Sequence, residues 1–227
     1  MKTILRIALA LVILLPTGLA AGAQVPLPQE EKTIQGIPVS DYYLMPEFTD
    51  GMIFFEGQGP AQGKLNICTL DHTLRFLDRD GKELAAKDED AIVKVRIDTV
   101  FFLRSQGYYY RLFPVNPEAG AALLKEVSIR REVKQGAYGT SSETSSVKEY
   151  DIIYADGVAY GIDRQYPYKV SETVALYKGN KVMALSKKNF RKLFPEKKAE
   201  IDAYFQAGHP LPESLEETLA LLRQFEE

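Results

Sequence analysis

The sequence predicts a mainly β protein of the α+β class, with an antiparallel, hairpin-rich sheet, sandwich- or barrel-like, followed by a C-terminal cluster of about three short helices. Two observations carry this prediction. Between about residues 50 and 185, apolar and polar side chains alternate with the period of two that is typical of half-buried strands. From residue 186 the apolar period changes to that of amphipathic helices. No helix-length pattern lies between the strand patterns, so a parallel, doubly wound sheet is not expected.

The N-terminal end has the pattern of a secretory signal peptide. Lys2 and Arg6 form a positive start, and residues 7–15 are an apolar stretch too short to span a bilayer. Residues 21–23 (AGA) provide the small side chains that signal peptidase requires. We therefore expect cleavage after Ala23 and a periplasmic or secreted protein.

Loss of these 23 residues would leave 204 residues and, because Lys2 and Arg6 are removed, change the formal net charge from -3 to -5. A mildly acidic balance is ordinary for a soluble surface. The only cysteine, Cys68, excludes an internal disulfide and does not follow the cleavage site as in a lipoprotein. No later stretch of 18 apolar residues predicts a transmembrane segment after signal removal.

Four segments are expected along the chain. After the signal peptide (1–23), residues 24–49 form a proline-rich extended arm outside the core, residues 50–185 the antiparallel β domain, and residues 186–227 the helical cap.

Turn residues separate the strand patterns of the β domain and predict four hairpins. Their loops are residues 78–81 (DRDG), 105–107 (SQG), 156–157 (DG) and 179–180 (GN). In the strand AIVKVRI, strict alternation places four side chains on one face: Ala91, Val93, Val95 and Ile97.

Three amphipathic helices are expected in the cap. The first buries Phe190, Leu193 and Phe194, and Pro195 starts the second, which Gly208 ends. Ser214 and Glu217 form a capping box for the third. The buried stripes of the second and third helices are Ile201, Tyr204 and Phe205, then Leu215, Leu219, Leu222 and Phe225.

The stretch from residue 186 to residue 205 (SKKNFRKLFPEKKAEIDAYF) carries six Lys or Arg among aromatic residues. Helical spacing separates these charges from the apolar stripe and distributes them over two helices, together with Glu196, Glu200 and Asp202. We therefore interpret the stretch as the solvated side of the cap and expect no nucleic-acid partner.

Three stretches together resemble an uncharacterised family of small exported proteins of Bacteroidetes-type bacteria. They are residues 63–85 (GKLNICTLDHTLRFLDRDGKELA), 136–146 (GAYGTSSETSS) and 175–205, which ends in LFPEKKAEIDAYF. The resemblance covers roughly residues 50–227 and implies export and a β-rich body with a helical tail. It implies no activity, cofactor or catalytic residue.

The sequence gives no catalytic, metal or cofactor motif. Placing Gly81 at the sixth position of a calcium loop puts Phe76 first and Lys87 twelfth, so that motif fails and Asp78 and Asp80 are interpreted as turn formers. A cysteine nucleophile needs a nearby base, but His72 and His209 both fall in expected loops, and Cys68 is expected to be a small inert residue on the sheet face opposite Leu65 and Ile67.

Tyrosines are the best candidates for ligand contact. We consider Tyr108, Tyr109, Tyr110, Tyr166 and Tyr168 as an exposed aromatic platform, with the alternative that alternate members face the core. The chain has no tryptophan, which argues against a typical sugar-binding cleft.

Two polar stretches complete the candidates. Residues 139–146 (GTSSETSS) are expected to be a flexible loop, and Asp98-Thr99-Val100 matches a short O-glycosylation pattern of Bacteroidetes-type bacteria, for which a chance match is an equal explanation.

Together these patterns favour an exported, non-catalytic binding or structural module of the bacterial cell envelope over an enzyme. Its partner would be an unknown envelope protein or a glycan. The alternative is a periplasmic hydrolase that acts on glycan or peptide through two carboxylates, which a chain with 31 acidic residues could supply.

Overall fold

The computed structural model describes residues 33–34, 37–87, 89–129 and 168–226, all within the compact unit Glu31–Glu227. The expected signal peptide, the hairpin around residues 156–157, the loop at residues 139–146 and Tyr166 lie outside the described residues. The N-terminal part contains the strands β1 (Thr33–Ile34) and β2 (Ile37–Pro38) and the short helix α1 (Val39–Tyr42).

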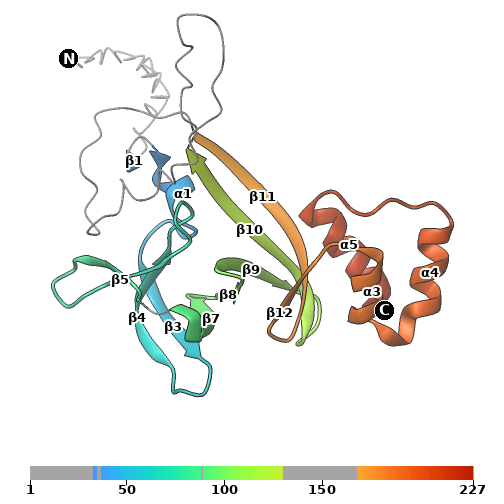
Figure 1. Ribbon diagram of the computed structural model, residues 1–227, viewed down its shortest axis with the longest axis horizontal. Coiled ribbons are helices and arrows are strands. Elements are labelled where there is room, and N and C mark those ends of the chain that lie inside the picture. The colour runs from blue at the N-terminus through green and yellow to red at the C-terminus, as the bar shows by residue number, and fades with distance from the viewer. Residues whose placement is uncertain (1–32, 35–36, 88, 130–167, 227) are drawn as a thin grey trace, which may run out of the picture. The chain divides into compact units, whose positions relative to one another are not determined.

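Ten further strands form one antiparallel sheet (Figure 1). They are β3 (Thr49–Phe55), β4 (Ala61–Ile67), β5 (Leu74–Leu77), β6 (Glu83–Ala85), β7 (Ile92–Ile97), β8 (Val100–Ser105), β9 (Tyr108–Pro114), β10 (Ala119–Ile129), β11 (Tyr168–Lys178) and β12 (Lys181–Ala184). Their order is β12-β11-β10-β9-β8-β7-β3-β4-β5-β6, and the sheet is not closed. Among the described strands, every neighbouring pair except β7 and β3 is consecutive in order, which confirms the predicted hairpin-rich antiparallel architecture.

Three predicted turns are confirmed. Gln106 and Gly107 have φ of 54° and 86° and link the facing residues Ser105 and Tyr108, as the tight loop of a hairpin requires. Gly179 has φ of 57° in the β11–β12 loop. At the β5–β6 turn, Asp78 Oδ1 accepts hydrogen bonds from the backbone amides of Asp80 and Lys82, both at 2.9 Å.

A β-bulge changes the faces expected for β7. Phe54 lies opposite Lys94 and Phe55 opposite Ile92, so Val93 has no opposite residue on β3. Ile92 therefore joins the core cluster of Val95, whereas Val93 packs against the cluster on the other face. The prediction that Val93 shares a face with Val95 is wrong because the extra residue shifts the alternation.

We call the two faces of the sheet face A and face B. Face A carries Val95, Phe102 and Tyr109, which belong to one buried cluster, and face B carries Leu103 and Tyr110, which belong to another. The sheet curves strongly and so brings the β4–β5 loop to β10. There the Val127 amide donates to the Thr69 carbonyl at 3.1 Å.

The structure differs from the expectation that residues 24–49 lie outside the core. Ile37, Tyr42 and Tyr43 are buried in a cluster with Cys68 and Val127. The tyrosines of the segment DYYLM supply enough apolar surface to pack here. The prolines and the weak periodicity around them did not predict this burial. Charged contacts reinforce the packing, because Lys125 Nζ lies 2.9 Å from Asp41 Oδ1.

The helical cap covers one end of the sheet (Figure 1). It comprises α3 (Lys187–Leu193), the 3₁₀ turn η2 (Pro195–Lys197), α4 (Lys198–Gln206) and α5 (Leu215–Glu226). Its core cluster includes Phe190, Ile201 and Phe225 together with Ala121 and Leu176 of the sheet. None of the helices in the described ranges is long and apolar enough to cross a membrane.

Helix ends in the cap follow the predicted signals with two adjustments. Ser214 Oγ accepts from the Glu217 amide at 3.2 Å, but the Glu217 carboxylate accepts from the Glu213 amide rather than from Ser214. Pro195 starts a 3₁₀ turn before α4 begins at Lys198.

Candidate ligand-binding groove

The tyrosines proposed from sequence do not form one platform. Tyr109 lies on face A, is 1% exposed and donates its hydroxyl hydrogen to Glu89 Oε2 at 3.0 Å. Tyr108 and Tyr110 point to face B, where both are half-buried. Tyr168 is half-buried at the far end of the β10–β11 ribbon, with its hydroxyl 3.2 Å from Asp41 Oδ2. The alternation considered in the sequence analysis therefore describes this strand.

His72 is the polar neighbour of this tyrosine face. Its ring meets Tyr108 edge-on at 4.6 Å between centroids, and its Nε2 lies 3.7 Å from Glu126 Oε1. Burial lowers the pKa of His72, although the Glu126 and Asp71 carboxylates act in the opposite direction. The expectation that His72 is an exposed loop residue is only partly met, because the loop turns it onto the sheet.

The other sequence candidates for chemistry have structural roles. Cys68 is fully buried, and burial raises the pKa of its thiol to about 12, so the nucleophilic thiolate is strongly disfavoured. Cys68 belongs to a different buried cluster from Leu65 and Ile67. Among the described residues, no group of three or more His, Cys, Asp or Glu could hold a metal ion.

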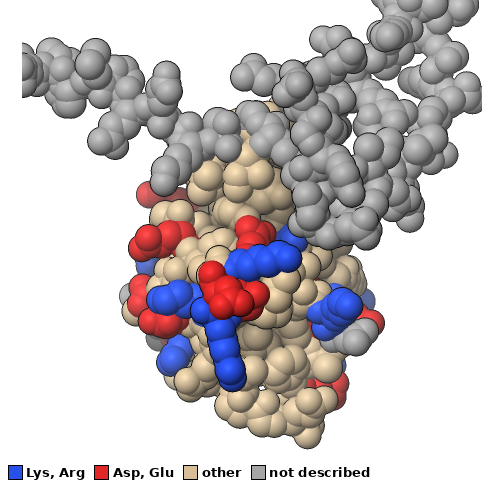
Figure 2. Space-filling model, turned by 90° about the vertical axis from the view of Figure 1, so that its left-hand side faces the viewer, with Lys and Arg blue, Asp and Glu red and all other residues tan. Residues whose placement is uncertain are grey.

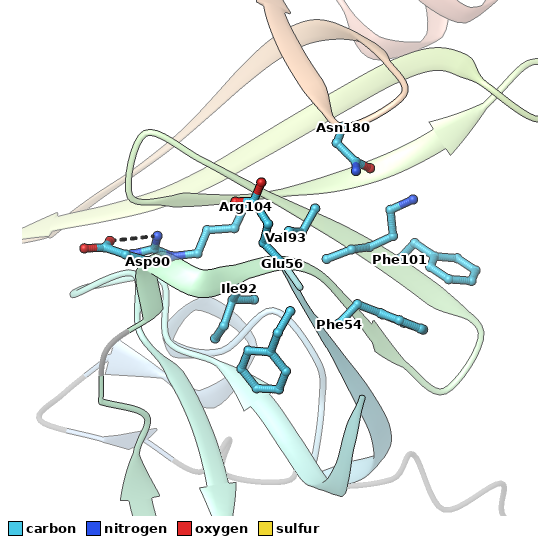
Figure 3. Close-up of a pocket in the computed structure, with 10 residues that line it drawn as sticks. Phe54, Glu56, Asp90, Ile92, Val93, Phe101, Arg104 and Asn180 are labelled. Atoms are coloured by element: carbon cyan, nitrogen blue, oxygen red, sulfur yellow. Dashed lines mark hydrogen bonds and ion pairs between the residues drawn. The ribbon is translucent and has the colours of Figure 1, made fainter. Parts of the chain in front are cut away.

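A different concave surface lies beside the bulge on β7 (Figure 3). This groove has a volume of about 710 Å³ and is open to solvent. It brings together residues from β3, β7 and β8 and from the loop between β11 and β12. Its lining residues are Phe54, Phe55, Glu56, Asp90, Ile92, Val93, Lys94, Phe101, Arg104 and Asn180.

Two phenylalanines form the apolar floor of the groove. Phe54 lies directly opposite Lys94 on β7, and Lys94 lies opposite Leu103 on β8, so all three side chains point to face B. Phe101 precedes Leu103 by two residues and shares this face. Phe101 is 41% exposed, and among the described residues it and Leu84 are the large apolar side chains that are exposed.

The bulge contributes to this floor. By redirecting Val93 to face B, it adds an apolar side chain beside the phenylalanines. Asn180 faces this surface from the tight β11–β12 loop, as Figure 3 shows. The groove thus depends on a local register shift and on a hairpin that is far away in sequence.

An ion-pair network fixes one wall of the groove. Arg104 Nη1 lies 3.2 Å from Asp90 Oδ1, and Arg104 Nε lies 3.4 Å from Glu89 Oε2 (Figure 3 shows the first contact). Behind them, Glu89 Oε1 accepts from the Leu74 amide at 2.7 Å, and Oε2 accepts from Tyr109. Burial raises the pKa of Glu89, and these hydrogen bonds oppose that effect.

Two charged residues of the groove are not neutralised in this way. Among the described residues, neither Lys94 nor Glu56 has an ion pair or a side-chain hydrogen bond. Both line the groove, Lys94 from the middle of β7 and Glu56 just after the end of β3. The groove therefore offers an apolar floor with one available cation and one available anion.

The charged surfaces give no support to nucleic-acid binding. On the face shown in Figure 2, Lys and Arg side chains lie among Asp and Glu side chains rather than in a patch of one sign. In the cap, Arg191 pairs with Asp202, Lys197 Nζ lies 3.7 Å from Glu200, and Lys187 Nζ lies 5.1 Å from the centre of the Phe205 ring. These contacts agree with the interpretation of this stretch as the polar side of the cap.

Searches of protein-family models, of curated proteins and of solved structures find no match to the chain. The groove could not be found from the sequence either, because its residues come from separate strands and carry no motif. One feature of the sequence did point to it. Phe101 and Phe102 are adjacent in a strand, so their side chains point to opposite faces and one of them had to face outward.

Proposed function

We propose that the protein is an exported, non-catalytic binding module of the bacterial cell envelope and that the groove is its ligand site. The single observation that carries the proposal is the exposed Phe101 beside the half-buried Phe54 in a concave surface. Covering such a side chain with a ligand is favourable by about 25 cal/mol per Å² of apolar surface removed from water. The signal-peptide pattern supports export to the envelope.

An amide chemical-shift titration of the exported chain tests this proposal. The probes are short peptides and oligosaccharides of the kinds found in cell envelopes. We expect the shift changes to concentrate at Phe54, Val93, Phe101 and Asn180. We also expect Phe101→Ala to weaken binding about tenfold without unfolding the protein. Binding that leaves these amides unchanged, or no binding by any probe, would contradict the proposal.

The second candidate remains a hydrolase, because two carboxylates, Glu56 and Asp90, line the same groove. Asp90 is fully exposed and paired with Arg104, and Glu89, whose pKa is raised, is engaged by the Leu74 amide and Tyr109. These contacts favour structural roles for Asp90 and Glu89. Turnover of an envelope glycan or peptide that Glu56→Gln and Asp90→Asn each abolish would establish the hydrolase instead.

A further inference from the structure

The groove has two features that a ligand would have to satisfy together. Its floor is apolar, and two of its charged residues, Lys94 and Glu56, have opposite signs and no ion pair with any residue that the structure describes. A ligand that covers the floor removes water from both charges. Withdrawing water from a charge is costly unless the ligand supplies an opposite charge or a hydrogen bond.

The two charged residues lie close enough for one short peptide to reach both. Lys94 lies opposite Phe54, and Glu56 follows Phe54 by two residues. Two residues of extended backbone span about 7 Å and neighbouring strands lie about 5 Å apart, so the two backbone positions are about 9 Å apart, a distance that the side-chain charges of a short peptide can also span. Asn180 adds a side-chain amide, which can donate to a peptide carbonyl and accept from a peptide N–H.

Glycans meet these conditions less well. A neutral oligosaccharide offers hydroxyl groups as hydrogen-bond partners but no opposite charge, and charge-assisted pairs are the stronger contacts. An acidic oligosaccharide pairs with Lys94 but brings its carboxylates towards Glu56, and like charges in a partly dehydrated site repel. A peptide supplies an anion, a cation and an apolar side chain in one chain.

Building on the proposed function, we propose that the groove binds a short dipolar peptide segment. An apolar side chain of the segment lies on Phe54 and Phe101, its carboxylate pairs with Lys94, and its cation pairs with Glu56.

Calorimetric titration of the full exported chain tests this proposal with one designed peptide and its variants. The probe is Lys-Leu-Glu with blocked ends, so that its charges are those of the side chains. The matched peptides Lys-Leu-Gln, Gln-Leu-Glu and Lys-Ser-Glu each remove one feature. Chitotetraose and tetragalacturonate represent neutral and acidic glycans. We expect Lys-Leu-Glu to bind more tightly than every other probe, and each missing charge to weaken binding about threefold to fivefold.

Variants of the protein test which charge of the groove pairs with which charge of the peptide. Lys94→Gln is expected to weaken binding of Lys-Leu-Glu about fivefold and to have little effect on Lys-Leu-Gln, which lacks the anion. Lys94→Glu is expected to reverse the preference in favour of Lys-Leu-Lys. The matched control is Lys188→Gln, which removes an exposed lysine of the cap and should change neither affinity.

The outcomes separate this inference from the proposed function. Tighter binding of either glycan, or equal binding of all the peptides, would overturn the dipolar-peptide assignment while leaving a binding groove. The proposed function fails as well if no probe changes the chemical shifts of the groove amides. It also fails if no probe gives a binding heat that the Phe101→Ala variant loses.

Discussion

The helical cap and the groove bury their phenylalanines to different extents. At the capped end, Phe190, Phe205 and Phe225 are between 0% and 6% exposed and pack on one another. At the groove, Phe101 is 41% exposed and Phe54 is half-buried. Phe190, Phe205 and Phe225 belong to helices α3, α4 and α5, which pack on one another and on the sheet, whereas no described helix covers face B at the groove. The comparison separates aromatic residues that hold the fold together from aromatic residues available to a ligand.

Truncating one phenylalanine in the cap and one in the groove should give the largest difference in the free energy of unfolding. We expect Phe190→Ala to lower the free energy of unfolding by about 3–5 kcal/mol, because it leaves a cavity between α3, α4 and α5. Phe101→Ala should lower it by only about 1 kcal/mol, because 41% of the residue is already exposed to water. Urea denaturation followed by circular dichroism measures both values. Equal losses would show that Phe101 is a core residue and would remove the basis of the comparison.

Close approach of strands at the capped end gives a second, smaller test. A Cβ atom added to Gly120 on β10 would contact the Phe113 carbonyl oxygen and lie 2.9 Å from Pro114 Cα, both parts of the β9 backbone. We expect Gly120→Ala to cost about 1–3 kcal/mol, because backbone atoms cannot move aside easily. The control is Gly59→Ala in the loop between β3 and β4, where no described atom beyond its chain neighbours lies within 4 Å of the added methyl group. A cost below about 0.5 kcal/mol at Gly120 would mean that the two strands can separate without loss.

The capped end could be predicted from sequence and the groove could not, for a physical reason. Helical burial depends on neighbours three and four residues apart, so the positions of Phe190, Leu193 and Phe194 predicted their burial. The groove depends on pairing between distant strands and on the bulge at Val93, which only the register of β3 against β7 reveals.

The tyrosine stretch shows the same limit. Its alternation predicted that neighbouring members face opposite sides, and Tyr109 and Tyr110 do so. Which side stays open to solvent depends on the β10–β12 strands that pack over face B, and a local pattern carries no information about them. The burial of Tyr42 and Tyr43 in a proline-rich segment was missed for the same reason.

The smallest expected effect is a change in the pH dependence of stability, and it comes from His72. It is half-buried on Tyr108 beside Glu126, and burial lowers the pKa of its imidazole below the ordinary 6.5. The unfolded chain therefore takes up the His72 proton at a higher pH than the folded protein does. Stability from the neutral ring is present above about pH 6.5 and is lost as the pH falls through the lower folded pKa.

We expect His72→Asn to remove this part of the pH dependence. Asparagine stays neutral and tolerates the positive φ of 56° at this position. Urea midpoints of both proteins between pH 7.5 and 5 provide the measurement, and the difference between them cancels the contribution of Glu89, whose raised pKa acts in the opposite direction. The wild-type protein should lose more stability than the variant as the pH falls. A steeper loss in the variant would mean that pairing of the imidazolium with Glu126 outweighs burial, so that His72 acts as a cation of the surface rather than as part of the covered sheet.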